Sequence, residues 1–306
     1  MPADPVSVRL RLDPALREVA VNRTVFTAEA IPLIREAMNQ RRSEARMDTA
    51  GVSIDQAAVA GVPVRIYRGG AGRAPAVLYC HAGGFALGNL DTDHRQCLEL
   101  ARRAGCTVVS VDYRLAPEHP YPAALNDAQE VLKWLHSRAS ELSIDPGRVA
   151  VAGSSAGGAL AAGLAHGAAD GELPPLVFQL LHQPVLDDRP TLSRNEFRAT
   201  PAFDGEAADL MWRHYLAGQQ PTPEAAPARR EVLAGLPPAL ITCAEVDPFR
   251  DEAVEYAQRL QSAGVPTELH VFSGACHGFD SLLPDWAESQ RLFALQGAAL
   301  AAAFRI

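Results

Sequence analysis

Short apolar runs alternate with segments of helical periodicity along most of this chain, and that alternation limits the folds open to it. Continuous apolar runs at residues 76–80, 107–111 and 239–243 suit strands that are buried on both faces. The segments between such runs place apolar residues three and four positions apart, which predicts helices. Strands that alternate with helices predict an α/β fold, with a mostly parallel sheet and helices on both faces.

The same reading assigns the individual elements. Strands are expected at residues 52–59, 62–67, 76–80, 107–111, 149–151, 176–181, 239–243 and 267–272. Helices are expected at residues 92–103, 123–138, 156–166, 250–263 and 285–303. Residues 1–47 have helical spacing, interrupted at Pro14 and Pro32. One face of this segment is expected to carry Ile31, Ile34, Ala37 and Met38.

Residues 187–235 break the alternation. This stretch is rich in proline and contains one helical segment, residues 206–216, whose Met211, Trp212 and Tyr215 offer apolar surface. Long insertions in compact domains usually carry function. We therefore expect one domain over residues 1–306, in which residues 1–47 and 187–235 form a helical cap over the active site. A loop excursion without contact to the substrate is the alternative.

The composition argues against several functional classes. The formal net charge is −8 and no basic cluster opposes it, so no nucleic-acid partner is expected. No apolar run reaches the ~18 residues of a membrane span, and the first twenty residues lack a signal-peptide core. The five cysteines form no CxxC pair, which favours reduced, buried thiols and a cytoplasmic location. No metal-ligand cluster or phosphate-binding loop occurs in the sequence, so neither metal nor cofactor is expected.

A nucleophile motif follows the predicted strand at residues 149–151. Residues 153–157 read Gly-Ser-Ser-Ala-Gly, and a helical pattern begins at once. A G-x-S-x-G sequence between a strand and a helix is typical of a sharp turn that exposes the central serine. Its glycines permit the tight backbone, and the helix N-terminus directs amides at the site. Ser155 is therefore the candidate nucleophile.

A serine nucleophile needs a base, and the base needs an acid that fixes its tautomer. His277 stands in a glycine-containing loop just beyond the last predicted strand and is the first candidate base; His182 is the second. The strand at residues 239–243 leads into an acidic loop with Glu245, Asp247 and Asp251. Asp247 is preferred, because the following proline favours an extended residue before a helix start. The order Ser…Asp…His is that of an α/β-hydrolase sheet.

Hydrolysis also needs donors for the oxyanion of the tetrahedral intermediate. Residues 81–85 read His-Ala-Gly-Gly-Phe directly after a predicted strand. The amides of Gly83 and Gly84 can approach the intermediate closely, and the Ala156 amide at the helix start is a third donor. A plain strand-to-loop junction is the alternative reading of the glycine pair.

Together these motifs resemble the hormone-sensitive-lipase family of α/β-hydrolases. The resemblance also rests on Asp-Tyr-Arg-Leu-Ala-Pro-Glu-His-Pro-Tyr-Pro-Ala at residues 112–123, on Asp-Pro-Phe-Arg-Asp-Glu at 247–252 and on His-Gly-Phe at 277–279. It spans about residues 50 to 300. It implies a carboxylesterase that acts on short to medium acyl esters without a cofactor, a helical cap, and a homodimer that forms through an edge strand.

Two positions depart from the family pattern. Ala82 stands where the family usually has the second residue of His-Gly-Gly-Gly, and Ser154 precedes the nucleophile where the family often has Asp. Neither change removes a group with an expected chemical role. His81 is expected to hold the oxyanion loop by hydrogen bonds rather than to react.

The predicted function is hydrolysis of small carboxylic esters through an acyl-enzyme on Ser155. Amide, lactone or carbamate hydrolysis by the same three residues is an alternative within enzymes. A non-catalytic receptor for a small ligand is an alternative from another class, and it is disfavoured because receptor-like relatives typically lack the histidine that this chain has as His277.

Overall fold

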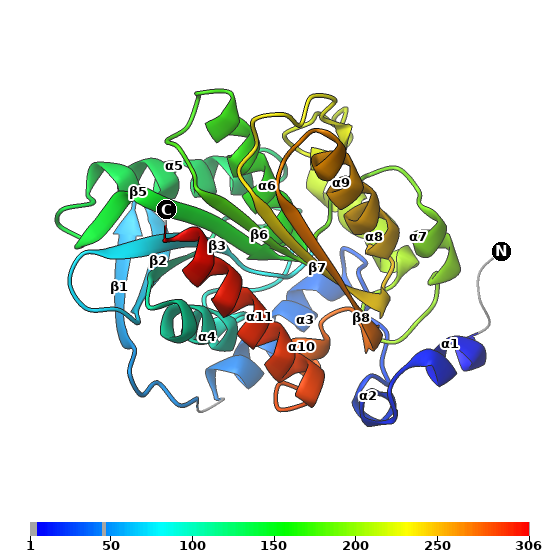
Figure 1. Cartoon of the computed structure of the whole chain (residues 1–306). Coiled ribbons are helices and arrows are strands. Elements are labelled where there is room, and N and C mark those ends of the chain that lie inside the picture. The colour runs from blue at the N-terminus through cyan, green and yellow to red at the C-terminus, as the bar shows by residue number, and fades with distance from the viewer. Residues whose placement is uncertain (1–4, 45–46, 306) are drawn as a thin grey trace.

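The computed structural model describes residues 5–44 and 47–305. Residues 1–4 and 45–46 of the predicted cap therefore lie outside the described residues. Figure 1 shows a twisted central sheet with helices on both sides of it. The sheet has eight strands in the order β1-β2-β4-β3-β5-β6-β7-β8. Strands β1 and β2 pair antiparallel, β2 pairs antiparallel with β4, and all pairs from β4 to β8 are parallel. The predicted mostly parallel sheet is confirmed.

The strands lie close to their predicted positions. Their bounds are β1 Ser53–Val59, β2 Val62–Arg68, β3 Ala74–Cys80, β4 Thr107–Val111, β5 Ile144–Ser154, β6 Phe178–His182, β7 Ala239–Val246 and β8 Thr267–Cys276. Strand β5 starts earlier than predicted, because Ile144 pairs with Ala74, and a register shift before the Val149–Ala76 pair then takes up residues 145–148.

The helices alternate with these strands. Those of the main body are α4 His94–Ala104, α5 Ala123–Ser137, α6 Ala156–Ala169, α9 Arg250–Ser262, α10 Phe279–Leu282 and α11 Ala287–Ala303. The N-terminal segment forms α1 Pro5–Arg11, α2 Pro14–Val19 and α3 Ala30–Ser43. The segment at residues 187–235 forms α7 Leu192–Glu196, α8 Gly205–Leu216 and the 3-10 turn η1 Pro227–Arg229.

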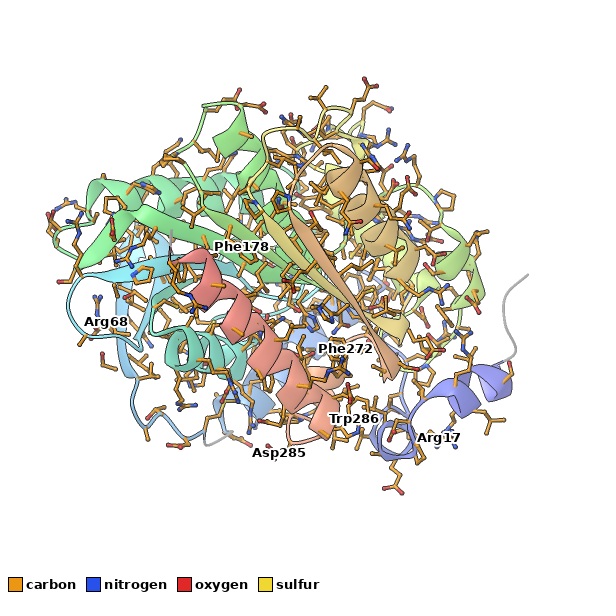
Figure 2. The ribbon with its side chains drawn as sticks, viewed as in Figure 1. Arg17, Arg68, Phe178, Phe272, Asp285 and Trp286 are labelled. Atoms are coloured by element: carbon orange, nitrogen blue, oxygen red, sulfur yellow. The ribbon has the colours of Figure 1, made fainter. Side chains whose placement is uncertain are left out.

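Along each strand the side chains point alternately to the two faces of the sheet, and each face has its own hydrophobic core. Leu78 of β3 lies between Val109 and Val151 of the neighbouring strands, and this row packs with α5, α6 and α9. The adjacent row, centred on Val77, packs on the other face with α4 and α11. Figure 2 shows Phe178 near the C-terminal end of α11 and Trp286 at its N-terminal end. Since both faces are covered, these strands are apolar throughout rather than alternating.

The expectations for the N-terminal segment are confirmed in part. The helical run breaks at Pro14 as predicted, since α1 ends at Arg11 and α2 begins at Pro14, whereas Pro32 lies in the first turn of α3 and interrupts no helix. In α3, Ile31 is buried and Ile34 and Met38 pack against the same core, but Ala37 is exposed. The buried face of α3 is therefore narrower than predicted.

The N-terminal segment and residues 187–235 are joined to each other. The Thr24 N–H donates to Ala202 O at 2.9 Å, and the Ala202 N–H donates to Asn22 O at 2.8 Å. Arg23 pairs with the buried Asp204 at 2.6 Å. These contacts place the two segments beside one another above the carboxyl ends of the strands.

Residues 187–235 are also anchored to α9. The buried Arg194 pairs with the buried Glu252 at 2.9 Å and also donates to the Asp187 and Asp188 carbonyls. Glu252 in turn accepts the Leu186 N–H at 2.7 Å. This buried ion pair fixes the start of the insertion relative to the sheet.

Candidate active site

Ser155 stands at the turn between β5 and α6. Its backbone has φ 55° and ψ −118°, a left-handed conformation that is costly for a residue with a side chain. The Ser155 N–H donates to His182 O at 2.8 Å, and Ser155 O accepts from the Val185 N–H at 3.1 Å. These bonds hold the strained turn, which is the geometry predicted for a nucleophile between a strand and a helix.

The glycines of the motif are required by close backbone contacts. A Cβ on Gly153 would lie 2.1 Å from Gly157 O, and a Cβ on Gly157 would lie 2.0 Å from Cys80 O. No side chain fits at either distance, so α6 can pack against β3 and β5 only with glycine at both positions.

His277 connects Ser155 to Asp247. Its Nε2 lies 3.0 Å from Ser155 Oγ, and its Nδ1 lies 2.9 Å from Asp247 Oδ2. Asp247 is fully buried, and its other oxygen accepts the Phe249 N–H at 2.8 Å. With Asp247 ionised, the Nδ1–H donates to it and leaves Nε2 free to accept the Ser155 hydroxyl proton. The structure thus brings together the three residues that the sequence selected as nucleophile, base and acid.

The alternative acids lie elsewhere. Glu245 accepts hydrogen bonds from Ser273 Oγ and the Gly274 N–H and pairs with Arg11. Asp251 pairs with Arg250 and accepts the Ser193 N–H. Neither carboxylate has a hydrogen bond to His277 among the described residues.

The second candidate base is also placed away from the nucleophile side chain. His182 is buried, with Nδ1 2.8 Å from Thr242 Oγ1 and Nε2 3.1 Å from Asp280 Oδ1. Burial alone would raise the pKa of Asp280, but the adjacent His182 lowers that pKa overall. His182 contributes to the site through its carbonyl, which accepts the Ser155 N–H.

The loop after β3 presents two amides toward the site. Gly83 has φ 136° and Gly84 has φ 58°, whereas Ala82 has no positive φ and so accommodates its methyl group. The Gly83 and Gly84 N–H groups have no hydrogen-bond acceptor in the part of the chain that the structure describes, although the Ala82 N–H donates to Asp93 at 2.8 Å. The Ala156 N–H, at the first position of α6, has no acceptor within its own helix. All three predicted oxyanion donors are therefore free to bind an oxygen atom.

His81 and Tyr113 stabilise the loop after β3 through their side chains. The two rings stack with centroids 4.2 Å apart, and Tyr113 donates its hydroxyl hydrogen to His81 O at 2.7 Å. Burial lowers the pKa of His81 to about 4, so the ring is neutral at pH 7 and its Nδ1–H donates to Ala82 O at 2.7 Å. This supports the expected structural role of His81.

Ser155 and His277 open into a cavity of about 390 Å³. Phe203, from the insertion, lies 5.7 Å from the His277 ring and 5.5 Å from the Phe26 ring of the N-terminal segment. Both segments of the predicted cap thus contribute aromatic walls to the cavity. Phe26 also contacts Gly84, where a Cβ would lie 2.7 Å from its ring.

Gln183, which is not among the site residues predicted from the sequence, connects the segment after β6 to the loop of His277. It is buried with φ 45°, its Oε1 accepts the Gly278 N–H at 2.6 Å, and its Nε2 lies 2.6 Å from His182 Nε2. Its place directly after a predicted strand end was a usable signal, since polar residues at such ends often serve a site.

Comparison with known proteins agrees with this geometry. Residues 77–281 match the family model described as the alpha/beta hydrolase fold. The chain belongs to the alpha/beta hydrolase fold family. The fold class and the family predicted from the sequence are confirmed.

Individual relatives are similar over most of the chain. Carboxylesterase NlhH of Mycobacterium tuberculosis is 39% identical over 90% of this chain and 91% of its own. Esterase LipI of the same organism is 46% identical over 67% of this chain and 66% of its own. The crystal structure of esterase LipW from Mycobacterium marinum is similar to this chain, with a TM-score of 0.96 over 99% of both chains. The two sequences are 69% identical.

Two further findings concern the described residues only. They contain no group of three or more His, Cys, Asp or Glu side chains placed to hold a metal ion. Within the same ranges, no helix is both long and apolar enough to cross a membrane.

Proposed function

We propose that Ser155 attacks small carboxylic esters, with His277 as the base and Asp247 as the residue that orients it. The observation that carries the proposal is the position of His277, whose two ring nitrogens lie 3.0 Å from Ser155 Oγ and 2.9 Å from Asp247 Oδ2. Membership of the family and the esterases among its relatives identify the chain as a carboxylic ester hydrolase, the enzyme class predicted from the sequence.

In the proposed first step, His277 Nε2 takes the hydroxyl proton as Ser155 Oγ bonds to the ester carbonyl carbon. The amides of Gly83, Gly84 and Ala156 stabilise the negative oxygen that forms. The C–O bond to the alcohol then breaks, and His277 returns the proton to the departing oxygen. Water attacks the acyl-enzyme by the reverse sequence of proton transfers and releases the acid.

We propose that the N-terminal segment and the insertion act as a cap on one catalytic domain. The contacts of Phe26 and Phe203 support this role, since these rings come from the two segments and meet at the cavity. A cavity of about 390 Å³ suits acyl chains of short to medium length.

The test is hydrolysis of 4-nitrophenyl acyl esters from two to sixteen carbons by the wild type, Ser155→Ala and Ser154→Ala. The proposal predicts a maximum at short or medium chains, loss of turnover in Ser155→Ala and its retention in Ser154→Ala. Wild-type turnover in Ser155→Ala contradicts the assignment. Loss in Ser154→Ala alone assigns the reaction to the neighbouring hydroxyl.

We also propose a homodimer that forms through β8, which is an edge strand and exposes Val271. Light scattering coupled to size-exclusion chromatography should give twice the mass of one chain, and a Val271→Lys variant should give the mass of one chain. A single-chain mass for the wild type contradicts the dimer.

We propose a cytoplasmic location because the cysteine thiols form no disulfide bonds. All five cysteines are unpaired and buried, as in proteins of reducing compartments. Cell fractionation should recover the esterase activity with cytoplasmic markers, and recovery from the medium or the periplasm contradicts the proposal.

A further inference from the structure

Three arginines line the catalytic cavity, and they differ in whether a carboxylate neutralises them. Arg23 pairs with Asp204 and Glu206, each at 2.6 Å. Arg41 and Arg42, on the last turn of α3, form no ion pair with any residue in the described ranges. In a chain with a net charge of −8, two unpaired cations at the catalytic cavity need an explanation.

The two side chains lie close enough to affect one another. Burial lowers the pKa of Arg42, and the neighbouring charge of Arg41 lowers it further, while Asp93 and Asp91 oppose this effect. Arg42 donates one hydrogen bond, to Thr92 Oγ1 at 2.8 Å. Since like charges repel, an anion that bound to both guanidinium groups would relieve the repulsion.

Two carboxylates that line the catalytic cavity, Asp93 and Asp280, have partners other than Arg41 and Arg42. Asp93 uses one oxygen to accept both the Tyr79 hydroxyl and the Ala82 N–H, and burial raises its pKa. Asp280 pairs with His182. Neither of these carboxylates lies within 4.0 Å of an arginine nitrogen in the described part of the chain. Asp93 and Asp91 therefore act on Arg42 only at longer range, and no carboxylate there forms a direct ion pair with Arg41 or Arg42.

The arginines stand where the catalytic cavity meets a second cavity of about 420 Å³. Both cavities are lined by Met38, Arg41, Arg42, Asp93 and residues 280–282. Phe26 and Leu87 line the catalytic cavity but not the second one, and they give the catalytic cavity apolar wall. A substrate arm that extends from the reacting carbonyl toward the second cavity would therefore contact apolar side chains as well as the two cations.

We infer that this hydrolase selects esters in which one arm ends in a carboxylate, bound by Arg41 and Arg42. The inference rests on the proposed esterase function and names its substrate class. A guanidinium binds a carboxylate with two parallel hydrogen bonds, which gives geometric selection as well as charge attraction. The reaction is ordinary ester hydrolysis: water adds, the ester C–O bond breaks, and an acid and an alcohol leave, while the terminal carboxylate is unchanged.

The test compares matched substrates that differ only at the far end. For the acyl arm, mono(4-nitrophenyl) suberate is compared with its neutral counterpart, in which the carboxylate is a primary amide. For the alcohol arm, the butyryl ester of 8-hydroxyoctanoic acid is compared with the butyryl ester of the corresponding amide. The readout is the ratio of kcat/KM for the anionic ester to kcat/KM for the neutral ester.

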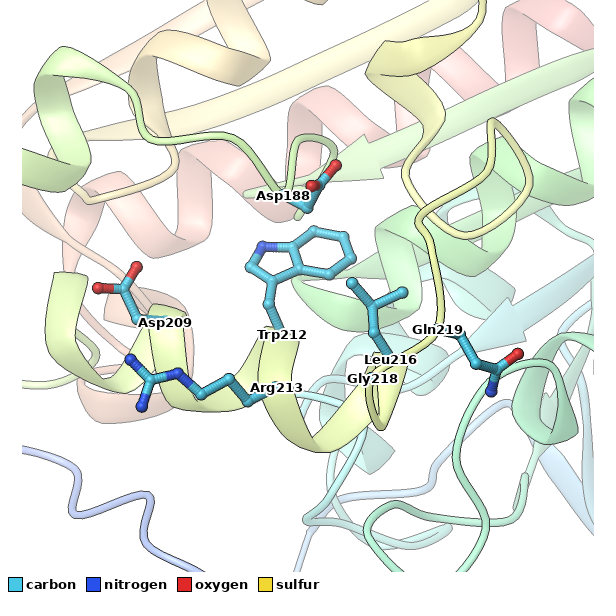
Figure 3. Close-up of a pocket in the computed structure, with 7 residues that line it drawn as sticks. All are labelled: Asp188, Asp209, Trp212, Arg213, Leu216, Gly218 and Gln219. Atoms are coloured by element: carbon cyan, nitrogen blue, oxygen red, sulfur yellow. The ribbon is translucent and has the colours of Figure 1, made fainter.

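In at least one pair, the wild type should favour the anionic ester, and Arg41→Gln should lower the ratio by about five- to tenfold. The pair that responds tells which arm carries the carboxylate. Arg41 is exposed, so its replacement does not disturb the core. Arg213→Gln is the matched control, since Arg213 also forms no ion pair in the described ranges but lines a separate pocket on α8 (Figure 3).

The outcomes separate this inference from the proposed function. Hydrolysis of both members of each pair with no anionic preference, or a ratio that Arg41→Gln leaves unchanged, overturns the inference and leaves the esterase intact. A ratio that falls equally in Arg213→Gln also overturns it, because general surface charge then explains the preference. Failure to hydrolyse any member overturns the proposed function itself.

Discussion

Gln183 accepts a hydrogen bond from the Gly278 N–H at 2.6 Å, and this bond connects the segment after β6 to the loop of His277. His277 directly precedes Gly278, and the carbonyl of His182, directly before Gln183, accepts the Ser155 N–H. One short segment therefore positions the backbones of both Ser155 and His277. Among the described residues, the Gln183 side chain has no hydrogen bond to the Ser155 or His277 side chain, and Gln183 does not line the cavity, so we expect it to act by positioning them.

Replacing Gln183 by Met should lower kcat about tenfold and change KM by less than about threefold, because the loss is in alignment rather than in binding. Gln179→Met is the matched control: Gln179 is also buried and lies on β6, the strand that Gln183 directly follows, but its amide donates to Pro237 O. Steady-state kinetics on folded protein provide the measurement. Equal loss of kcat in both variants would indicate a structural effect only.

Gly157→Ala tests the close packing of the nucleophile turn. The added Cβ would lie 2.0 Å from Cys80 O, and that oxygen belongs to a central strand that cannot move freely. We expect a loss of about 3 kcal/mol or more in the free energy of unfolding. Urea denaturation checks this, with Gly147→Ala as the control, because its Cβ meets only Asp145 Oδ1 at 3.5 Å. A stable Gly157→Ala protein contradicts the account of the turn.

His166 should make the fold acid-sensitive. It is buried on α6 beside the Tyr256 hydroxyl, and burial lowers its pKa from 6.5 to about 3. The unfolded chain binds this proton below pH 6.5 and the folded chain does not, so the stability that the neutral ring contributes is lost as the pH falls from 6.5 toward 3.

Between pH 7.5 and pH 5 the wild type should therefore lose about 2 kcal/mol more unfolding free energy than His166→Gln. Denaturant titrations at the two pH values measure the difference. An identical pH dependence in both proteins would show that His166 has no part in the acid response.

Breaking the buried ion pair of Arg194 and Glu252 should lower the free energy of unfolding more than breaking a surface ion pair. Arg194→Leu leaves a carboxylate buried without its partner and should cost about 3 to 5 kcal/mol of unfolding free energy. Arg189→Leu removes a pair with Asp187 in which the arginine is 52% exposed, and it should cost less than about 1 kcal/mol. Thermal or urea unfolding compares them. Similar losses in the two variants would contradict the anchoring role of Arg194.

Local patterns predicted most of the fold, and they also selected the residues that we propose to react. The strands at β3, β4 and β7 were evident because they are buried on both faces and so read as continuous apolar runs. Ser155 was evident because its turn requires glycine at fixed neighbouring positions, and His277 and Asp247 because they follow strand ends. Each of these signals lies within about ten residues of the chain.

Contacts between distant segments could not be predicted in the same way. The bond from Gly278 to Gln183 joins residues that are 95 positions apart, and nothing around either residue specifies the other. Nothing in the local sequence distinguishes Arg194 from a surface arginine, although it is buried against Glu252. Likewise, the place of Arg41 and Arg42 at the catalytic cavity depends on how α3 packs, which periodicity does not give.

The central claim is that Ser155 is the nucleophile, and covalent labelling tests it most directly. Diethyl 4-nitrophenyl phosphate reacts with an activated serine hydroxyl, which displaces 4-nitrophenolate and keeps the diethylphosphoryl group. Intact-mass measurement and peptide mapping should find one label per chain, on Ser155, and none on Ser155→Ala. A label on another residue, or an unlabelled wild type that still hydrolyses esters, would contradict the account.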